Sequence, residues 1–125
     1  MIAKIRLVLL GALIILLAST APAIAAEADV VSTRELLSAP DRWHGLPVML
    51  SGKVTHLEPR VSRRGNSYFT FRLADRSGTV TVFSHGAPPV KDGDRVRVDG
   101  TFLKVKRVGK YTFQNQVDAS RITLL

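Results

Sequence analysis

Hydrophobic and polar residues alternate along the chain from residue 48 onward. In residues 48–55, the apolar positions Val48, Leu50 and Val54 alternate with positions that are mostly polar. A period of two places successive side chains on opposite faces of an extended backbone, so this segment is predicted to be a β-strand with one buried face. Gly52 within the strand predicts a bulge or a sharp bend.

Four more segments with the same alternation follow, over residues 68–74, 79–83, 95–105 and 111–124. In the first three of them, every second, apolar side chain is predicted to face the interior, and the last segment is predicted to contribute Val117, Ala119 and Ile122. These predicted core residues are Phe69, Phe71, Leu73, Val80, Val82, Val96, Val98, Phe102, Val117, Ala119 and Ile122.

The segments between the strands are rich in turn-forming or charged residues. They are predicted to form a basic loop at 60–67, a tight turn at 75–78, an irregular crossover at 84–90, a turn at 91–94 and a second basic loop at 106–110. Asp75 is predicted to cap its own turn, because a short carboxylate readily accepts hydrogen bonds from the backbone two residues on.

The residues from 26 to 47 predict an N-terminal extension with a short helix. Ser32 and Glu35 have the spacing of a capping box, in which each side chain accepts a hydrogen bond from the backbone of the other residue. Pro40 is predicted to end the helix after one or two turns. Trp43 is predicted to pack this extension onto the main body, and a role in ligand binding is the alternative.

The first 25 residues have the features of a secretory signal peptide. A basic start is followed by a continuous apolar run over residues 7–17, and residues 23–25 are the small-residue sequence Ala-Ile-Ala. The run is short for a bilayer-spanning helix, which needs about 20 apolar residues. We therefore expect export to the periplasm, cleavage after Ala25 or Ala26, and contact with the membrane only through this segment. The alternative is an uncleaved N-terminal anchor.

Composition excludes several classes of protein. Of the 125 residues, 46% are hydrophobic and 22% are charged, which is too apolar for an intrinsically disordered chain. The absence of cysteine excludes disulfides, thiolate metal sites, a cysteine nucleophile and a lipid-anchored cysteine. The length permits one domain. Five strands with glycine bends, one short helix and no strand–helix–strand spacing predict an all-β barrel over residues 48–125.

Four blocks of the sequence resemble the anticodon-binding type of OB-fold, which occurs in nucleic-acid-binding modules. They are VMLSGKVTHLE at 48–58, YFTFRLADRSGTVTVF at 68–83, VKDGDRVRVDGTF at 90–102 and QVDASRITLL at 116–125. The resemblance implies a five-stranded OB-fold barrel that binds single-stranded nucleic acid or another polyanion. With the leader, the chain resembles an exported bacterial member of this type.

An OB-fold binds ligands on its second and third strands, between the loops that join strands one and two and strands four and five. Both loops are basic here, and the net charge of the chain is +8. Cations would contact phosphates and aromatic rings would stack on bases. The candidate ligand-binding residues are Arg60, Arg63, Arg64, Tyr68, Arg72, Lys104, Lys106, Arg107, Lys110 and Tyr111. The alternative is that the loops are simply solvated and that the tyrosines pack at the edge of the barrel.

No cofactor, metal or catalytic site is predicted. His44, His56 and His85 are scattered without the spacing of metal ligands, and the aspartates do not form an acid–base pair. We therefore expect a binding module rather than an enzyme. The main alternative function is a structural module of the cell envelope whose partner is another protein, and attraction to anionic lipid is a third possibility.

Overall fold

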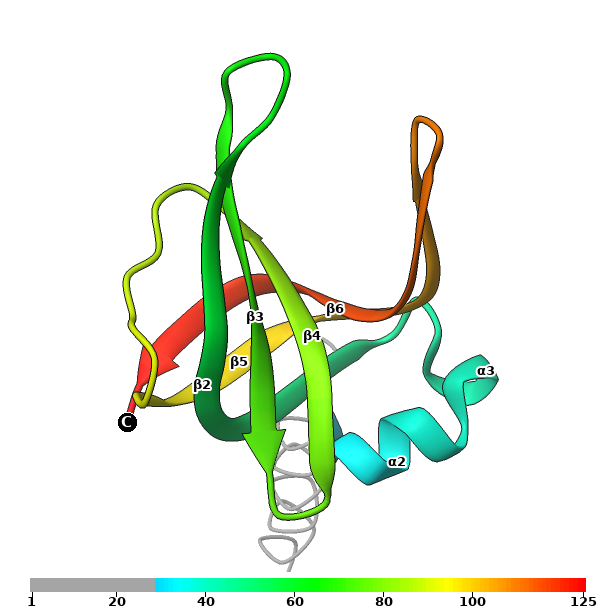
Figure 1. Cartoon of the computed structure of the whole chain (residues 1–125). Coiled ribbons are helices and arrows are strands. Elements are labelled where there is room, and N and C mark those ends of the chain that lie inside the picture. The colour runs from blue at the N-terminus through cyan, green and yellow to red at the C-terminus, as the bar shows by residue number, and fades with distance from the viewer. Residues whose placement is uncertain (1–28) are drawn as a thin grey trace, which may run out of the picture.

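The computed structural model describes residues 29–125, so the predicted leader and its cleavage sites lie outside the described residues. The described part contains five long β-strands, one two-residue strand and two short helices (Figure 1). The strands are β1 Asp29–Val30, β2 Pro47–Val61, β3 Ser67–Asp75, β4 Gly78–His85, β5 Arg95–Val108 and β6 Tyr111–Leu124, and the helices are α2 Thr33–Ser38 and α3 Pro40–Trp43. All five expected strands are present. β1 is an addition to them, and it pairs in parallel with the start of β2.

The pairings of the five long strands form a ring. β2 pairs with β3 and β5, β3 pairs with β4, β4 with β6, and β6 with β5. These pairings are antiparallel except for β4–β6, which is parallel. With β1 the sheet has six strands rather than the five that the sequence predicts. Because β2 pairs on both sides, the inward faces of all five long strands can share one core.

The core consists largely of the residues that the alternation predicts, and Val31 and Val90 are additions to them. Nine of the predicted residues are at most 3% exposed: Phe69, Phe71, Leu73, Val80, Val82, Val96, Val98, Phe102 and Val117. Ala119 and Ile122 pack against this core and are partly buried. Leu36 of α2 and Trp43 of α3 are also part of it, which confirms the predicted packing role of Trp43. Each fully buried side chain of this kind contributes about 1.5–3 kcal/mol, so the burial of one face drives the strands together.

β2 pairs with β5 up to Lys53 and with β3 from the same residue onward. A Cβ atom on Gly52 would lie 2.5 Å from the carbonyl oxygen of Ala74. Glycine is therefore required here because two backbones approach closely as the strand passes from one partner to the other. The bulge itself lies further along, as a register shift between Thr55 and Glu58.

The capping box in front of α2 is confirmed. The Ser32 hydroxyl accepts a hydrogen bond from the Glu35 N–H at 3.1 Å, and the Glu35 carboxylate accepts one from the Ser32 N–H at 3.2 Å. α2 ends at Ser38, before Pro40, as predicted. The sequence does not predict that Pro40 then begins a second short helix, α3, where the first helical position does not need the N–H that proline lacks.

Asp75 caps the β3–β4 turn, as predicted, and also links this turn to α2. Its carboxylate accepts hydrogen bonds from the N–H groups of Ser77 and Gly78, from the Ser77 hydroxyl and, at 2.9 Å, from the Thr33 N–H. Burial alone raises the pKa of Asp75, but the hydrogen bonds from Ser77 and Thr33 outweigh it and hold the pKa below its ordinary value. The charged carboxylate therefore joins the helix to the sheet.

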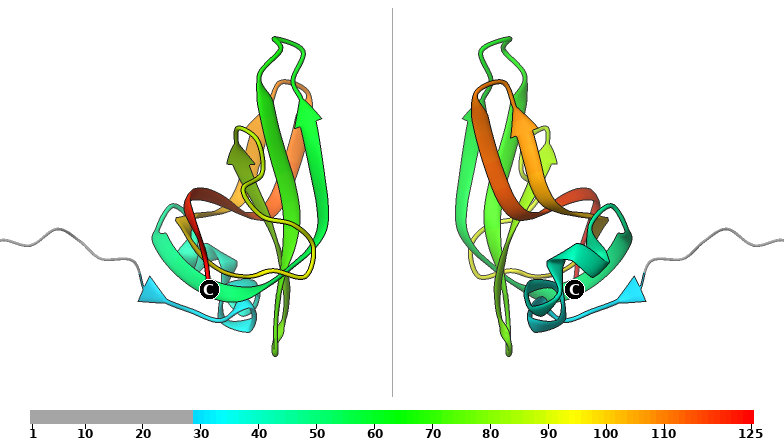
Figure 2. Two further views of the ribbon diagram at one scale, coloured as in Figure 1. Left: turned by 90° about the vertical axis from the view of Figure 1, so that its left-hand side faces the viewer. Right: turned by 90° about the vertical axis from the view of Figure 1, so that its right-hand side faces the viewer.

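Two hairpins are longer than the sequence predicts. β2 extends to Val61 and β5 to Val108, so the loops expected from residues 60 and 106 are shorter and the hairpins turn at 62–66 and 109–110. The β2–β3 hairpin and the β5–β6 hairpin project from the same end of the sheet, as Figures 1 and 2 show. In the β5–β6 hairpin, residues 105–108 pair with residues 111–114 beyond the pairing of β6 with β4, whereas β3 stays paired with β4 as far as Tyr68.

The connection between β4 and β5 is irregular, as predicted. Residues 86–94 contain bends and turns but neither helix nor strand. Within residues 29–125, no helix is long and apolar enough to span a bilayer.

Candidate functional site

Three aromatic side chains lie together on the outer face of β3 and β4. Tyr68 is paired with His85, and Phe83 is two residues from His85. All three side chains therefore point to the face opposite to that of the buried core residues. The ring centroids of Tyr68 and Phe83 are 5.4 Å apart, and those of Phe83 and His85 are 5.0 Å apart in an edge-to-face arrangement. We call Tyr68, Phe83 and His85 the aromatic cluster. It offers ring surface to a ligand at the level where the two hairpins begin.

Lys106 joins the β5–β6 hairpin to the aromatic cluster. Its Nζ atom lies 3.6 Å from the centre of the Phe83 ring and 3.0 Å from Oδ2 of Asp118. The side chain is only 17% exposed. The sequence predicts Lys106 as a loop cation, but the structure places it on β5 and pairs its charge. A cation above an aromatic face is stabilised by the quadrupole of the ring, so Lys106 fixes the hairpin beside the cluster.

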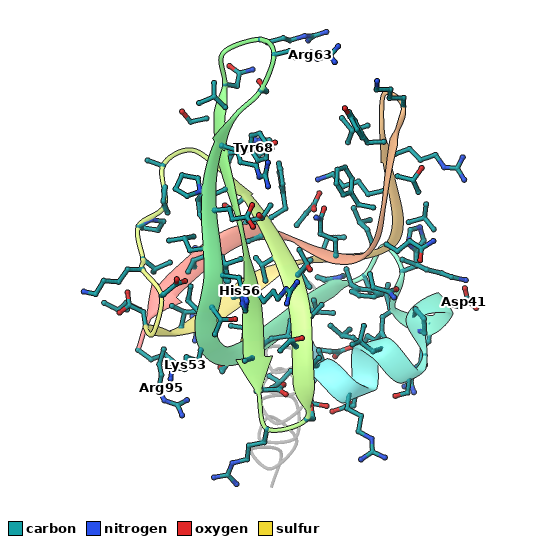
Figure 3. All side chains as sticks on the ribbon, in the orientation of Figure 1. Asp41, Lys53, His56, Arg63, Tyr68 and Arg95 are labelled. Atoms are coloured by element: carbon teal, nitrogen blue, oxygen red, sulfur yellow. The ribbon has the colours of Figure 1, made fainter. Side chains whose placement is uncertain are left out.

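Five predicted cations are exposed. Arg107 is paired with Thr112 and therefore lies on the face of the β5–β6 hairpin opposite to Lys106, and the other four lie around the aromatic cluster. Arg63 and Arg64 are at the tip of the β2–β3 hairpin, where Figure 3 shows Arg63 at the far end of the molecule. Arg107 and Lys110 are at the tip of the β5–β6 hairpin, and Arg72 projects from β3. Within the described residues, none of the five forms a salt bridge. Their charges are therefore available to an anionic ligand.

The two remaining predicted cations are paired. Arg60 lies on β2 rather than in a loop, and it forms a salt bridge with Glu58 on the same strand. Lys104 is directed to α3, where its Nζ atom pairs with Asp41 at 2.5 Å. Figure 3 shows Asp41 on the helical side of the molecule, apart from Tyr68. The structure therefore does not bring Lys104 to the aromatic cluster.

Tyr111 lies at the start of β6 and is 55% exposed. The Nζ atom of Lys110 is 5.6 Å from the centre of its ring. In the part of the chain that the structure describes, Tyr111 makes no ring contact with the aromatic cluster. Tyr68 is half-buried, by contrast, and belongs to the cluster.

A shallow pocket of about 210 Å³ lies between the bulge of β2 and the outer face of β3 and β4. Its lining is mostly polar: His56, Glu58, Arg60, Thr70, Phe71, Arg72 and Thr81. Hydroxyl, imidazole and guanidinium groups are the donors that phosphate or carboxylate oxygens require. His56 has a left-handed φ of 52°, a conformation that a non-glycine residue adopts only when its surroundings enforce it.

Two members of the aromatic cluster, Phe83 and His85, are not among the residues predicted from the sequence. Val80 and Val82 face the core, and the same parity rule places Phe83 and His85 outward. The alternation therefore indicates their outward direction, but the contact between Phe83 and Lys106 depends on the pairing of β4 with β6.

Within residues 29–125, no three His, Asp or Glu side chains are grouped to hold a metal ion.

The chain matches no family model and no curated protein. It is similar to solved structures. With the crystal structure of yeast Stn1 and Ten1 it has a TM-score of 0.63 and 10% identity, and the match covers 80% of this chain and 64% of that chain. With an OBody bound to hen egg-white lysozyme, the TM-score is 0.56 and the identity 21%, over 81% of this chain and 97% of the OBody.

An OB domain from Thermoplasma acidophilum is 26% identical, with a TM-score of 0.50 over 78% of this chain and 88% of that domain. These similarities cover most of the residues that the structure describes. They show that the arrangement of strands is that of an OB-fold, and they do not identify a ligand.

Proposed function

We propose that this OB-fold domain binds single-stranded nucleic acid or another anionic polymer on the outer face of β3 and β4, and that it binds rather than catalyses. The observation that carries the proposal is the aromatic cluster of Tyr68, Phe83 and His85, set between two projecting hairpins with basic tips. Rings provide stacking surface, and unpaired cations provide contacts to phosphate.

The charges around the face are suited to a flexible polyanion. Arg63 and Arg64 lie in the turn of one hairpin and Lys110 in the turn of the other, so a ligand that crosses the aromatic cluster can contact both. Each phosphate contact releases condensed counterions, which makes binding tight at low salt and weaker as salt rises. Arginine can also hold a phosphate through two parallel hydrogen bonds.

A fluorescence-polarisation titration with labelled single-stranded oligonucleotides at several salt concentrations tests the proposal. We expect binding at low salt and a linear fall of log K with log salt concentration. The double variant Arg63→Ala/Arg64→Ala should reduce the slope of this fall by about 1.4, because it removes two contacts and each contact to a single strand contributes about 0.7. No binding at low salt would overturn the proposal.

The matched control is Lys53→Ala/Arg95→Ala, which removes the same charge elsewhere. Figure 3 shows Lys53 and Arg95 at the end of the molecule opposite to Arg63. The two residues are paired across β2 and β5, and both are exposed. If the control weakens binding as much as the hairpin variant does, net charge alone explains the affinity.

A protein partner in the cell envelope is the second candidate. The similar OBody is bound to lysozyme, so this fold can present a surface to a protein. The discriminating experiment is capture of partners from envelope extracts by the wild type and by Arg63→Ala/Arg64→Ala. A partner that binds both equally, without any oligonucleotide binding, favours this candidate.

We also propose that the protein is exported and that its leader is removed after Ala25 or Ala26. The basic start, the apolar run and the small residues before the cleavage site support this proposal. Expression of the full chain in a bacterial host, fractionation and mass measurement of the product test it. A full-length product in the membrane fraction would show an anchor instead.

A further inference from the structure

The β5–β6 hairpin presents an apolar surface toward the aromatic cluster. Val108 is paired with Tyr111, and Lys106 with Phe113. Directly opposed residues of an antiparallel pair share a face, and residues two apart on one strand also share it. Val108, Tyr111 and Phe113 therefore lie on the face that carries Lys106, whose Nζ atom contacts the Phe83 ring. We call these three residues the apolar wall.

The side chains of the apolar wall are exposed to solvent although they are hydrophobic or aromatic. Val108 is 51% exposed, Tyr111 55% and Phe113 42%. Three neighbouring apolar side chains on one face of a projecting hairpin leave hydrocarbon and ring surface in contact with water. A ligand that covers them gains free energy from their burial.

The β2–β3 side of the face has the opposite character. Arg60 is paired with Tyr68, and Arg72 with Thr81, so both arginines lie on the outer face, and Arg63 and Arg64 lie at the tip beyond them. We call Arg60, Arg63, Arg64 and Arg72 the arginine wall. Glu58 compensates one of these four charges. One side of the candidate site is thus apolar and the other is cationic.

We infer that the ligand carries nucleobases, and that it lies with its bases against the apolar wall and its phosphates along the arginine wall. This inference rests on the proposed function and names the ligand of the same site. Single-stranded nucleic acid has one anionic edge and one edge of flat, apolar-faced bases, which matches the two walls. A polyphosphate would leave the apolar wall in water, and an apolar peptide would leave the unpaired arginines without anions.

The test compares two probes of equal length and charge. One is a labelled oligothymidylate of about 12 nucleotides, within the site sizes of single OB-folds, and the other is its abasic counterpart. We expect the wild type to bind the oligothymidylate about tenfold or more tightly, since stacking contributes on the order of five- to hundredfold per base. The salt dependence should be similar for both probes, because their phosphates are the same.

Variants of the two walls should separate the two contributions. Tyr111→Ala/Phe113→Ala should weaken the preference for the base-bearing probe, with the rings of the aromatic cluster still present, and leave the salt dependence unchanged. Arg63→Ala/Arg64→Ala should weaken both probes and reduce the salt dependence. The control Thr112→Ala/Gln114→Ala lies on the other face of the same strand and should bind as the wild type does. Thermal unfolding of each variant checks that the domain remains folded.

A fluorescent variant reports stacking directly. Tyr111→Trp places an indole on the apolar wall, and the other tryptophan of the chain, Trp43, is buried in the core. Oligothymidylate should quench the new indole and the abasic probe should not. Equal binding of both probes by the wild type, with no effect of Tyr111→Ala/Phe113→Ala, would overturn this inference and leave the polyanion proposal intact. Failure of both probes to bind would overturn the two together.

Discussion

At Gly100, the close approach of two strands leaves no room for a side chain. A Cβ atom there would overlap the carbonyl oxygen of Asp118 on β6, beside the register shift between Asp99 and Gly100. We expect Gly100→Ala to lower the free energy of unfolding by about 1–3 kcal/mol, because β5 and β6 must move apart. Urea denaturation measures this loss. Thr112→Ala on the exposed hairpin is the control, and a loss of similar size there would show that the packing argument is wrong.

Asp75 makes stability depend on pH. Its pKa is lower in the folded protein, so the carboxylate contributes stability above its unfolded pKa, and this contribution is lost as the pH falls through the folded pKa. We expect Asp75→Asn to be less stable than the wild type at neutral pH and to lose less stability between about pH 7 and pH 3. Chemical denaturation at both pH values measures this difference. Parallel losses in the two proteins would contradict the assigned role.

At the scale of elements, Lys106 of β5 holds the β5–β6 hairpin against Phe83 of β4, and Asp118 of β6 pairs with its ammonium group. Asp118→Asn removes the anion that pairs with a largely buried ammonium group. Leaving such a group without its partner costs about 1–3 kcal/mol. We expect faster amide hydrogen exchange in the β5–β6 hairpin, with little change where β2 pairs with β5. Unchanged exchange in the hairpin would show that the backbone pairing alone fixes its position.

The same elements show what alternation can and cannot predict. The strands at residues 68–74 and 95–105 can be predicted because every second side chain in them is buried. The structure confirms Phe69, Phe71 and Phe102 in the core. In the outer parts of the hairpins, neither face of the strands is buried. The sequence therefore predicts basic loops where the structure has strands. Cross-strand hydrogen bonding, rather than burial, extends β2 to Val61 and β5 to Val108.

At the scale of the whole molecule, the sequence predicts the basic residues near the candidate site but not the contacts that they make. Tyr68 and Arg72 project outward as the parity rule requires. The contact of Lys106 with Phe83 follows instead from the parallel pairing of β4 and β6, which no local pattern specifies. The pairing of Lys104 with Asp41 depends likewise on where α3 packs. Long-range pairing therefore decides which basic residues share a face.

The most direct test of the proposed binding face is a map of backbone amide chemical shifts during titration of the isotope-labelled protein with oligothymidylate. If the ligand lies between the hairpins, the largest changes should occur at Tyr68, Phe83 and His85 and at the hairpin turns 62–66 and 109–110. Amides near Lys53 and Arg95 should change little. Changes concentrated at that opposite end, or spread evenly over the basic surface, would contradict the proposed binding face.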